Sequence, residues 1–363
     1  MRALQRGGVA VMLSIMALMA TASPAAAHGR GSDATNFLSV ITSAPEDDGV
    51  TFEIVNSDEY LLVRNDGEEE VAVAGYTGEP YLRIGPDGAW RNENSPATYL
   101  NADRYGQTVV PRGVDGDAEP RWEQVSSEGA FAWHDHRIHW MATTNPPVVQ
   151  TDPASRHLVN EWTVPVEIGG RPAEIIGELY WVPGSGPLPW LITALVLLSV
   201  PIGWALWRTR PDVGSGRWRG LSLVSGTVLL LLAIANGIHL VDDLVATPIP
   251  LTQSITSALQ TAFFISIAMY AAFRTIIGGE GAFVALGAGT GAIFIGQGLL
   301  YASVLAASQT ATVFPEFLTR GVIAASLAQI VPLGIASVLG TRALLPQWDD
   351  EPDDVPSAVV SGE

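Results

Sequence analysis

The chain has 363 residues with 19 basic and 37 acidic side chains, a formal net charge of -18, and no cysteine. Its charge argues against a nucleic-acid partner, because such a surface repels phosphates, and the missing cysteines exclude disulfides and thiolate metal sites. Residues 28–184 hold ten Arg against 26 Asp and Glu, so nearly all of the acidic excess lies in the first half.

The first 27 residues have the three-part pattern of a secretory signal peptide. Arg2 and Arg6 precede an apolar stretch at residues 9–20, and small residues follow up to the alanines at 25–27. We expect cleavage after this alanine run, which makes His28 the first residue of the mature chain.

Residues 28–184 are predicted to form an extracytoplasmic β-sandwich of the immunoglobulin or cupredoxin kind. Short extended runs alternate with turn residues, and the clearest unit is a hairpin around Gly169-Gly170. The stretch 92–124 is expected to be a long loop over a sheet edge. The predicted strands are 50–55, 60–64, 71–76, 81–84, 131–141, 162–168 and 173–181.

Residues 185–345 are predicted to form a bundle of about five transmembrane helices, followed by an acidic tail at 346–363. After a Pro/Gly linker at 183–187, five apolar segments each reach the roughly 20 residues that a bilayer requires. They are expected near 188–207, 219–240, 251–273, 282–306 and 318–340. The chain is therefore predicted to be a multi-pass membrane protein in contact with lipid.

Arginines predict the orientation of this bundle. The loop after the first segment holds four Arg at 208–219, and Arg274 and Arg342 fall on the same side. Positively charged loops stay in the cytoplasm. The N-terminal domain is then outside and the C-terminus cytoplasmic, in agreement with the signal peptide.

Polar residues in the second segment suggest a possible second site. His239, Asp242 and Asp243 follow Asn236 at helical spacing, where ionisable groups are costly inside a membrane. Two interpretations stay open: water-exposed capping near the outer interface, or a relay that accepts an ion from the domain above it.

Three of the six histidines lie in the run 133–141, Trp-His-Asp-His-Arg-Ile-His-Trp-Met. If this run is a strand, His134 and His136 share one face and His139 lies on the other. Two imidazoles on one face can reach one metal ion, and imidazole suits copper, zinc, iron or nickel. The alternative is that they are ordinary polar residues on a wet face.

A mature N-terminal His28 adds an α-amine and a ring nitrogen, and with one further imidazole this makes the copper site called a histidine brace. An N-terminal His followed about 105 residues later by His-x-His resembles the cupredoxin-like soluble subunit of particulate methane monooxygenase, whose β domain also precedes membrane helices. The resemblance implies copper ligands at His28, His134 and His136. The present chain differs from that subunit in having five predicted membrane helices rather than two.

A second resemblance is to the CopC copper-resistance proteins, which also use an N-terminal His in a small β-sandwich. Those proteins carry an Asp and a His two residues apart, whereas Asp135 here adjoins two His directly. Neither resemblance extends beyond these residues, the β domain and the membrane attachment.

Three functions remain open from the sequence. The first is an extracytoplasmic copper-binding protein, with His28, His134, His136 and His139 as candidate ligands, that stores copper or hands it to the membrane domain. The second is a structural or sensory envelope protein with no metal site, and another membrane or envelope protein as partner. The third is a copper-dependent oxidase. Motifs for hydrolysis or nucleotide binding are absent from the sequence.

Overall fold

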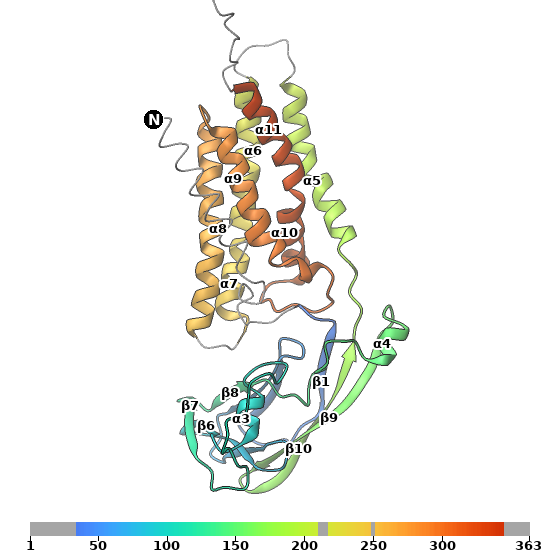
Figure 1. Ribbon diagram of the computed structural model, residues 1–363, viewed down its shortest axis with the longest axis vertical. Helices are drawn as coiled ribbons and strands as arrows, with labels where there is room; N and C mark the ends of the chain where they lie inside the picture. The colour runs from blue at the N-terminus through green and yellow to red at the C-terminus, as the bar shows by residue number, and fades with distance from the viewer. Residues whose placement is uncertain (1–33, 210–216, 248–250, 345–363) are drawn as a thin grey trace, which may run out of the picture.

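The computed structural model describes residues 34–209, 217–247 and 251–344. The predicted signal peptide, His28 and the acidic tail lie outside these ranges. Figure 1 shows a β-rich part from the first half of the chain and a helical bundle from the second, arranged end to end. Two antiparallel sheets are followed by five long apolar helices. The predicted fold class is therefore confirmed.

The β domain contains a seven-stranded sheet in the order β1-β10-β9-β4-β5-β6-β7 and a three-stranded sheet in the order β2-β3-β8. All pairs between neighbouring strands are antiparallel. The strands are β1 (Phe37–Ser43), β2 (Val50–Val55), β3 (Tyr60–Asn65), β4 (Val71–Ala74), β5 (Pro80–Gly85), β6 (Gly88–Asn92), β7 (Trp122–Ser126), β8 (Ala130–Trp133), β9 (His157–Ile168) and β10 (Arg171–Trp181).

The predicted hairpin is present and consists of the two longest strands, β9 and β10. Ile168 pairs with Arg171 across the turn, and Gly169 and Gly170 have φ values of 56° and 76°. A type I′ turn requires positive φ at both central residues, and its twist matches that of the strands it joins. Side chains of β9 alternate between buried and exposed from Trp162 onwards, so one face of the hairpin covers the core.

One hydrophobic core lies between the two sheets. Leu61 and Val63 of the three-stranded sheet cluster with Val73, Ile84 and Ile175 of the seven-stranded sheet, and each is at most 1% exposed. Full burial of an aliphatic side chain stabilises a fold by roughly 1.5–3 kcal/mol. This core therefore supplies the stability that disulfides provide in many secreted domains.

The predicted strand at 131–141 is wrong beyond Trp133, because the chain turns after β8. Strands β1, β6 and β7 were not predicted. The stretch 92–124 is not one continuous loop, since it contains the short helix α3 (Pro96–Leu100) and reaches the start of β7. Ser95 begins α3 by accepting a hydrogen bond from the Ala97 amide at 3.2 Å, and Pro96 fits the first turn.

The described residues hold five spans long and apolar enough to cross a membrane: Leu188–Arg208, Trp218–Val245, Ser254–Ile277, Ala282–Leu299 and Glu316–Ala343. They agree with the five predicted segments. Their elements are α5 (Leu188–Arg208), α6 (Arg217–Ala235), α7 (Gly237–Val245), α8 (Leu251–Ile277), α9 (Ala282–Ile293), η1 (Phe294–Leu299), α10 (Glu316–Ala328) and α11 (Ile330–Leu344).

Three of these spans are interrupted. Asn236 separates α6 from α7, and Gln329 separates α10 from α11. In the fourth span η1 is a stretch of π-helix that continues α9 and contains Gln297. Each interruption thus carries a side-chain carboxamide.

The β domain is joined to the bundle by hydrogen bonds as well as by the linker. Thr35 pairs with Gln309 as an isolated antiparallel bridge. The Ser308 hydroxyl donates to the Val182 carbonyl at 2.6 Å, and the Ser308 amide donates to Asn36 Oδ1 at 2.7 Å. These bonds tie both ends of the β domain, the start of β1 and the end of β10, to the loop before α10 (Figure 1).

Arginines gather at the end of the bundle far from the β domain. Arg208 ends α5, Arg274 is in the last turn of α8, and Arg342 is in the last turn of α11. These helix ends lie together at the top of Figure 1. Arg219 caps α8 there by donating to the Ile276 carbonyl at 2.7 Å. Arg320 of α10 is the exception among the described arginines of the bundle, since it is bonded to the loop before α10, next to the β domain.

Candidate functional site

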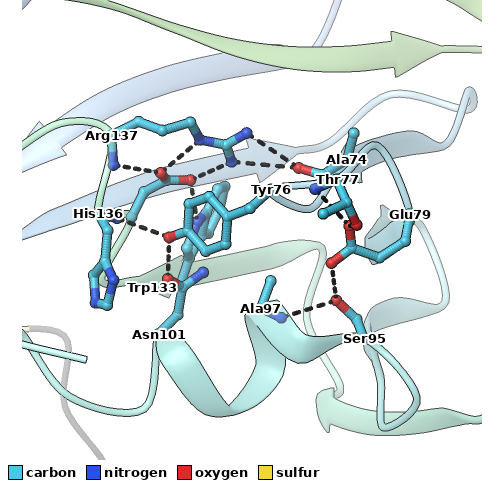
Figure 2. Close-up of polar contacts among 11 residues, drawn as sticks. Ala74, Tyr76, Thr77, Glu79, Ser95, Ala97, Asn101, Trp133, His136 and Arg137 are labelled. Carbon is cyan, nitrogen blue, oxygen red and sulfur yellow. Dashed lines mark hydrogen bonds and ion pairs between the residues drawn. The ribbon is translucent and has the colours of Figure 1, made fainter. Parts of the chain in front are cut away.

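A buried ion pair turns the chain after β8 (Figure 2). Asp135 is fully buried and accepts from Trp133 Nε1 at 2.9 Å and from the Arg137 amide at 3.0 Å. Its carboxylate also accepts from Arg137 Nε and Nη2 at 2.7 and 2.6 Å. Burial alone would raise the pKa of Asp135, but the bonds from Arg137 hold it below its usual value. This bonding explains why the predicted strand ends here.

Tyr76 connects this turn to β4 and α3 (Figure 2). The Arg137 guanidinium lies 5.1 Å from the centre of the Tyr76 ring, and the His136 amide donates to the Tyr76 hydroxyl at 3.0 Å. The hydroxyl in turn donates to Asn101 Oδ1. Burial raises the pKa of Tyr76, so the phenol stays protonated. These contacts hold the backbone from which the histidines project.

Glu79 at the edge of Figure 2 is a structural group. It accepts from Ser95 Oγ at 2.7 Å and from the Thr77 amide and hydroxyl at 2.9 and 2.8 Å. Burial favours the neutral acid, yet these hydrogen bonds outweigh it and hold the pKa of Glu79 below its usual value. Such a group stays ionised near neutral pH, so it is unsuited to general-acid chemistry.

Each histidine of the run donates one ring N–H to a backbone carbonyl. His134 Nδ1 faces the Glu59 carbonyl at 3.1 Å, His136 Nε2 faces that of Asp103 at 3.0 Å, and His139 Nε2 faces that of Arg104 at 2.8 Å. A carbonyl only accepts, so each of these nitrogens carries the proton. The other ring nitrogen is then left with its lone pair, as a metal ligand requires.

His136 and His139 lie side by side, although a strand would have placed them on opposite faces. Their ring centroids are 5.3 Å apart. Two imidazoles on one ion have centroids up to about 6 Å apart, given metal–nitrogen bonds of about 2.1 Å and about 1 Å from nitrogen to ring centre. The separation of these two rings is compatible with a shared ion.

His139 Nδ1 is buried and has no hydrogen-bond partner among the described residues. The Met141 thioether lies 3.1 Å from Nε2 of the same ring. Gly106 packs against His136 and Met141, and its φ is 62°. A Cβ at this position would come within 2.9 Å of His136 Cε1 and 3.5 Å of the Met141 methyl group. Position 106 therefore requires glycine if these rings are to keep their places.

Asp103 shapes the loop that supplies the two carbonyls. Its carboxylate accepts from the amides of Tyr105, Gln107 and Thr108 at 2.8 to 3.1 Å, and from the Thr108 hydroxyl at 2.7 Å. Burial opposes ionisation, but these bonds lower the pKa of Asp103 to about 2. The loop is thus fixed by its own side chain rather than by regular secondary structure.

Arg104 neutralises the acidic turn next to the histidines. It pairs with Asp58 at 2.5 Å and with Glu59 at 3.5 Å. Burial raises the pKa of Asp58 to about 6, against the opposing effect of Arg104. Burial, with a smaller contribution from the Arg104 charge, lowers the pKa of His134 to about 4 and that of His139 to about 3. Both imidazoles are therefore neutral at pH 7.

Within the described ranges, no three His, Cys, Asp or Glu side chains are arranged to hold a metal ion. A complete site would need a further ligand such as His28, which lies outside the described residues. His157 lies apart from the cluster and contacts the Asp152 carbonyl at 2.6 Å. His134, His136 and His139 therefore do not form a three-imidazole site on their own, and the histidine brace with His28 stays a prediction.

The residues of the possible second site have partners inside the chain. Asp242 accepts from the Thr312 hydroxyl at 2.8 Å, and Asp243 accepts from the Thr261 hydroxyl at 2.6 Å. His239 is 2% exposed and stacks on Tyr301, with ring centroids 4.5 Å apart. These side chains face the bundle and the loop before α10. Whether they bind an ion stays a prediction.

Several residues of this region were not predicted. Met141 follows His139 by two positions, and its thioether lies against His139 Nε2. Arg104, Gly106 and Tyr301 come from distant segments, and no local pattern indicates their contacts.

No family model, curated protein or solved structure matches this chain.

Proposed function

We propose that this chain is a membrane protein of the cell envelope whose β domain binds copper and hands it to the helical bundle. The observation that carries this proposal is the pair His136 and His139. Both rings are oriented by backbone carbonyls, they lie 5.3 Å apart, and the lone-pair nitrogen of His139 is buried without a partner among the described residues. Carbonyl-bound imidazoles of this kind are typical of metal ligands.

The available nitrogen donors suit copper among several transition metals. The Met141 thioether is not a further donor in this arrangement, because it lies 3.1 Å from the protonated Nε2 of His139, whereas the free lone pair is on Nδ1. The neutral state of His139 also removes the competition from protons.

The N-terminal residue His28 would complete the site. The backbone amide of Ser39 in β1 donates to the Ser57 carbonyl at 2.8 Å, two residues before Glu59, whose carbonyl contacts His134. The five peptide steps from Ala34 to Ser39 cover at most about 17 Å, and the six residues before Ala34 can span about 20 Å. A mature chain that starts at His28 is long enough to return to the cluster.

One turn of the β domain supports handover to the bundle. The turn at 56–59 contacts Arg104 and His134 on one side. On the other side Asn56 Nδ2 donates to the Thr247 hydroxyl at 2.9 Å. Thr247 follows α7, which carries Asp242 and Asp243. This turn therefore connects the region of the histidines with the helix that carries those carboxylates.

The arginines support the orientation that we propose. Arg208, Arg274 and Arg342 lie at the bundle end far from the β domain, and the positive-inside rule favours a cytoplasmic location for such an end. The β domain would then lie outside the membrane, where the predicted signal peptide also directs it. This orientation gives the site access to extracytoplasmic copper.

Metal analysis of the purified chain beginning at His28 tests the proposal. We expect about one copper per chain, and loss of copper in His139→Gln, with an affinity decrease larger than the roughly 10–100-fold typical of outer-shell changes. The matched control is His157→Gln, which removes an imidazole outside the cluster and should retain copper. Equal copper content in both variants would contradict the site.

A structural or sensory role without metal is the second candidate. It is supported by the ion pairs of Arg104 and Arg137, which neutralise the nearby carboxylates from within the domain. A chain that folds normally but binds no copper at either oxidation state would favour this second candidate.

A further inference from the structure

The three interrupted helices meet inside the bundle. Asn236 Nδ2, between α6 and α7, donates to the Ser326 hydroxyl of α10 at 3.0 Å. Gln329, at the end of the same helix, donates to the Thr290 carbonyl of α9 at 2.9 Å. A Cβ on Gly298 of η1 would come within 3.2 Å of the Leu327 amide, so η1 packs directly on this part of α10. The three interruptions therefore belong to one region.

Each interruption carries a carboxamide with no solvent exposure. Asn236, Gln297 and Gln329 are all 0% exposed. A polar side chain in the middle of an apolar span is unfavourable unless it is bonded, and π-helical stretches occur frequently at functional sites. Asn236 meets this condition through its reciprocal bonds with Ser326.

The other two carboxamides are not satisfied by the described residues. Gln297 Nε2 and Oε1, Gln329 Oε1 and Thr290 Oγ1 are buried, and none has a hydrogen-bond partner in the described part of the chain. Thr290 lies in α9 and Gln297 lies two turns later in η1; helix side chains tilt towards the N-terminus, so the Gln297 side chain extends back along this segment in the direction of Thr290. Gln329 lies against that segment through its bond to the Thr290 carbonyl.

We propose that these interruptions form an intramembrane binding site for an alkali-metal cation, with oxygen ligands from Gln297, Gln329 and Thr290. Amide and hydroxyl oxygens are hard, neutral ligands of the kind that replace the hydration shell of such ions in membrane proteins. Amides do not gain or lose protons near neutral pH, which distinguishes this site from a proton relay.

The surrounding charges suit a cation that enters from the β-domain side. Asp243 accepts from Thr261, and the Tyr301 hydroxyl lies 3.3 Å from Asp243 Oδ1. Tyr301 is four positions after Gln297 and stacks on His239. Arg320 does not compete for the site, since it is bonded to carbonyls of the loop before α10 and to Glu316. This proposal does not depend on copper binding by the β domain.

Thermal unfolding of the full chain in detergent, with a chelator that removes copper, tests the proposal. At equal ionic strength, sodium or potassium chloride should raise the Tm by several degrees over choline chloride, and the increase should grow with concentration. Gln297→Leu should abolish this difference. The control Gln260→Leu, on a partly exposed position of α8, should keep it. The same Tm in all three salts would overturn the proposal.

A second variant covers the case in which Gln297→Leu does not fold. Gln297→Glu places a carboxylate among the same oxygens, so its Tm should be lower in choline chloride and should rise more steeply with alkali cations than that of the wild type. A salt response of Gln297→Glu equal to that of the wild type would contradict cation binding at this position.

Discussion

Replacing Asp135 by Asn should cost the β domain much of its stability. The carboxylate accepts four hydrogen bonds, from Trp133 Nε1 and from the amide, Nε and Nη2 of Arg137, and both side chains of the pair are largely buried. The Asn side chain keeps only one acceptor oxygen, and its NH2 group would face two of these four N–H donors, which then lose their acceptor. Breaking a buried ion pair by removing one partner costs about 3–5 kcal/mol.

Thermal unfolding followed by tryptophan fluorescence measures this change in the full chain. A loss of this size lowers the Tm of a domain this large by on the order of 10 °C. The control is Glu70→Gln, which removes the same charge from an ion pair with Arg83 whose side chains are 40% and 38% exposed. An exposed pair contributes at most about 1 kcal/mol. If the two variants lower the Tm equally, the turn does not depend on the buried pair.

Two further predictions concern pH and topology. The pKa values of His134 and His139 lie below 6.5 in the folded chain, so as pH falls the unfolded chain binds protons on these residues before the folded chain does. The folded state is therefore fully stable above pH 6.5 and loses stability as pH falls towards 4 and 3. Asp58, with a raised pKa of about 6, opposes this loss in part; the Tm without metal should still fall between pH 6.5 and 4, and a flat profile would contradict the shifts. Reporter fusions after Trp207 should read cytoplasmic and those after Leu251 extracytoplasmic; the reverse would refute the orientation.

The sequence predicted those elements whose pattern is local. Alternating strands such as β2 and β3, the Gly-Gly hairpin and five apolar spans all follow from periodicity, turn chemistry and length. It did not predict β7, because that strand is short and largely polar. The interruptions at Asn236 and Gln329 were also missed, since they lie in sequences that are apolar enough to continue as helix.

The candidate site was only partly predictable for the same reason. The histidine run was recognised from composition, but the turn that brings His136 beside His139 depends on the Ala74 carbonyl and the Tyr76 ring, which lie about 60 positions away. The carbonyls of Asp103 and Arg104 come from an irregular loop. Contacts between distant loops leave no periodic signal in the sequence.

Copper titration of the full mature chain against a chromophoric chelator tests the central proposal most directly. The chain that begins at His28 should take one copper from the chelator, and a version with one extra N-terminal residue should bind more weakly, because the extension moves the α-amine away from the site. Equal affinity of the two would remove His28 from the site. If neither chain competes with the chelator any better than His136→Gln/His139→Gln, the β domain has no copper site.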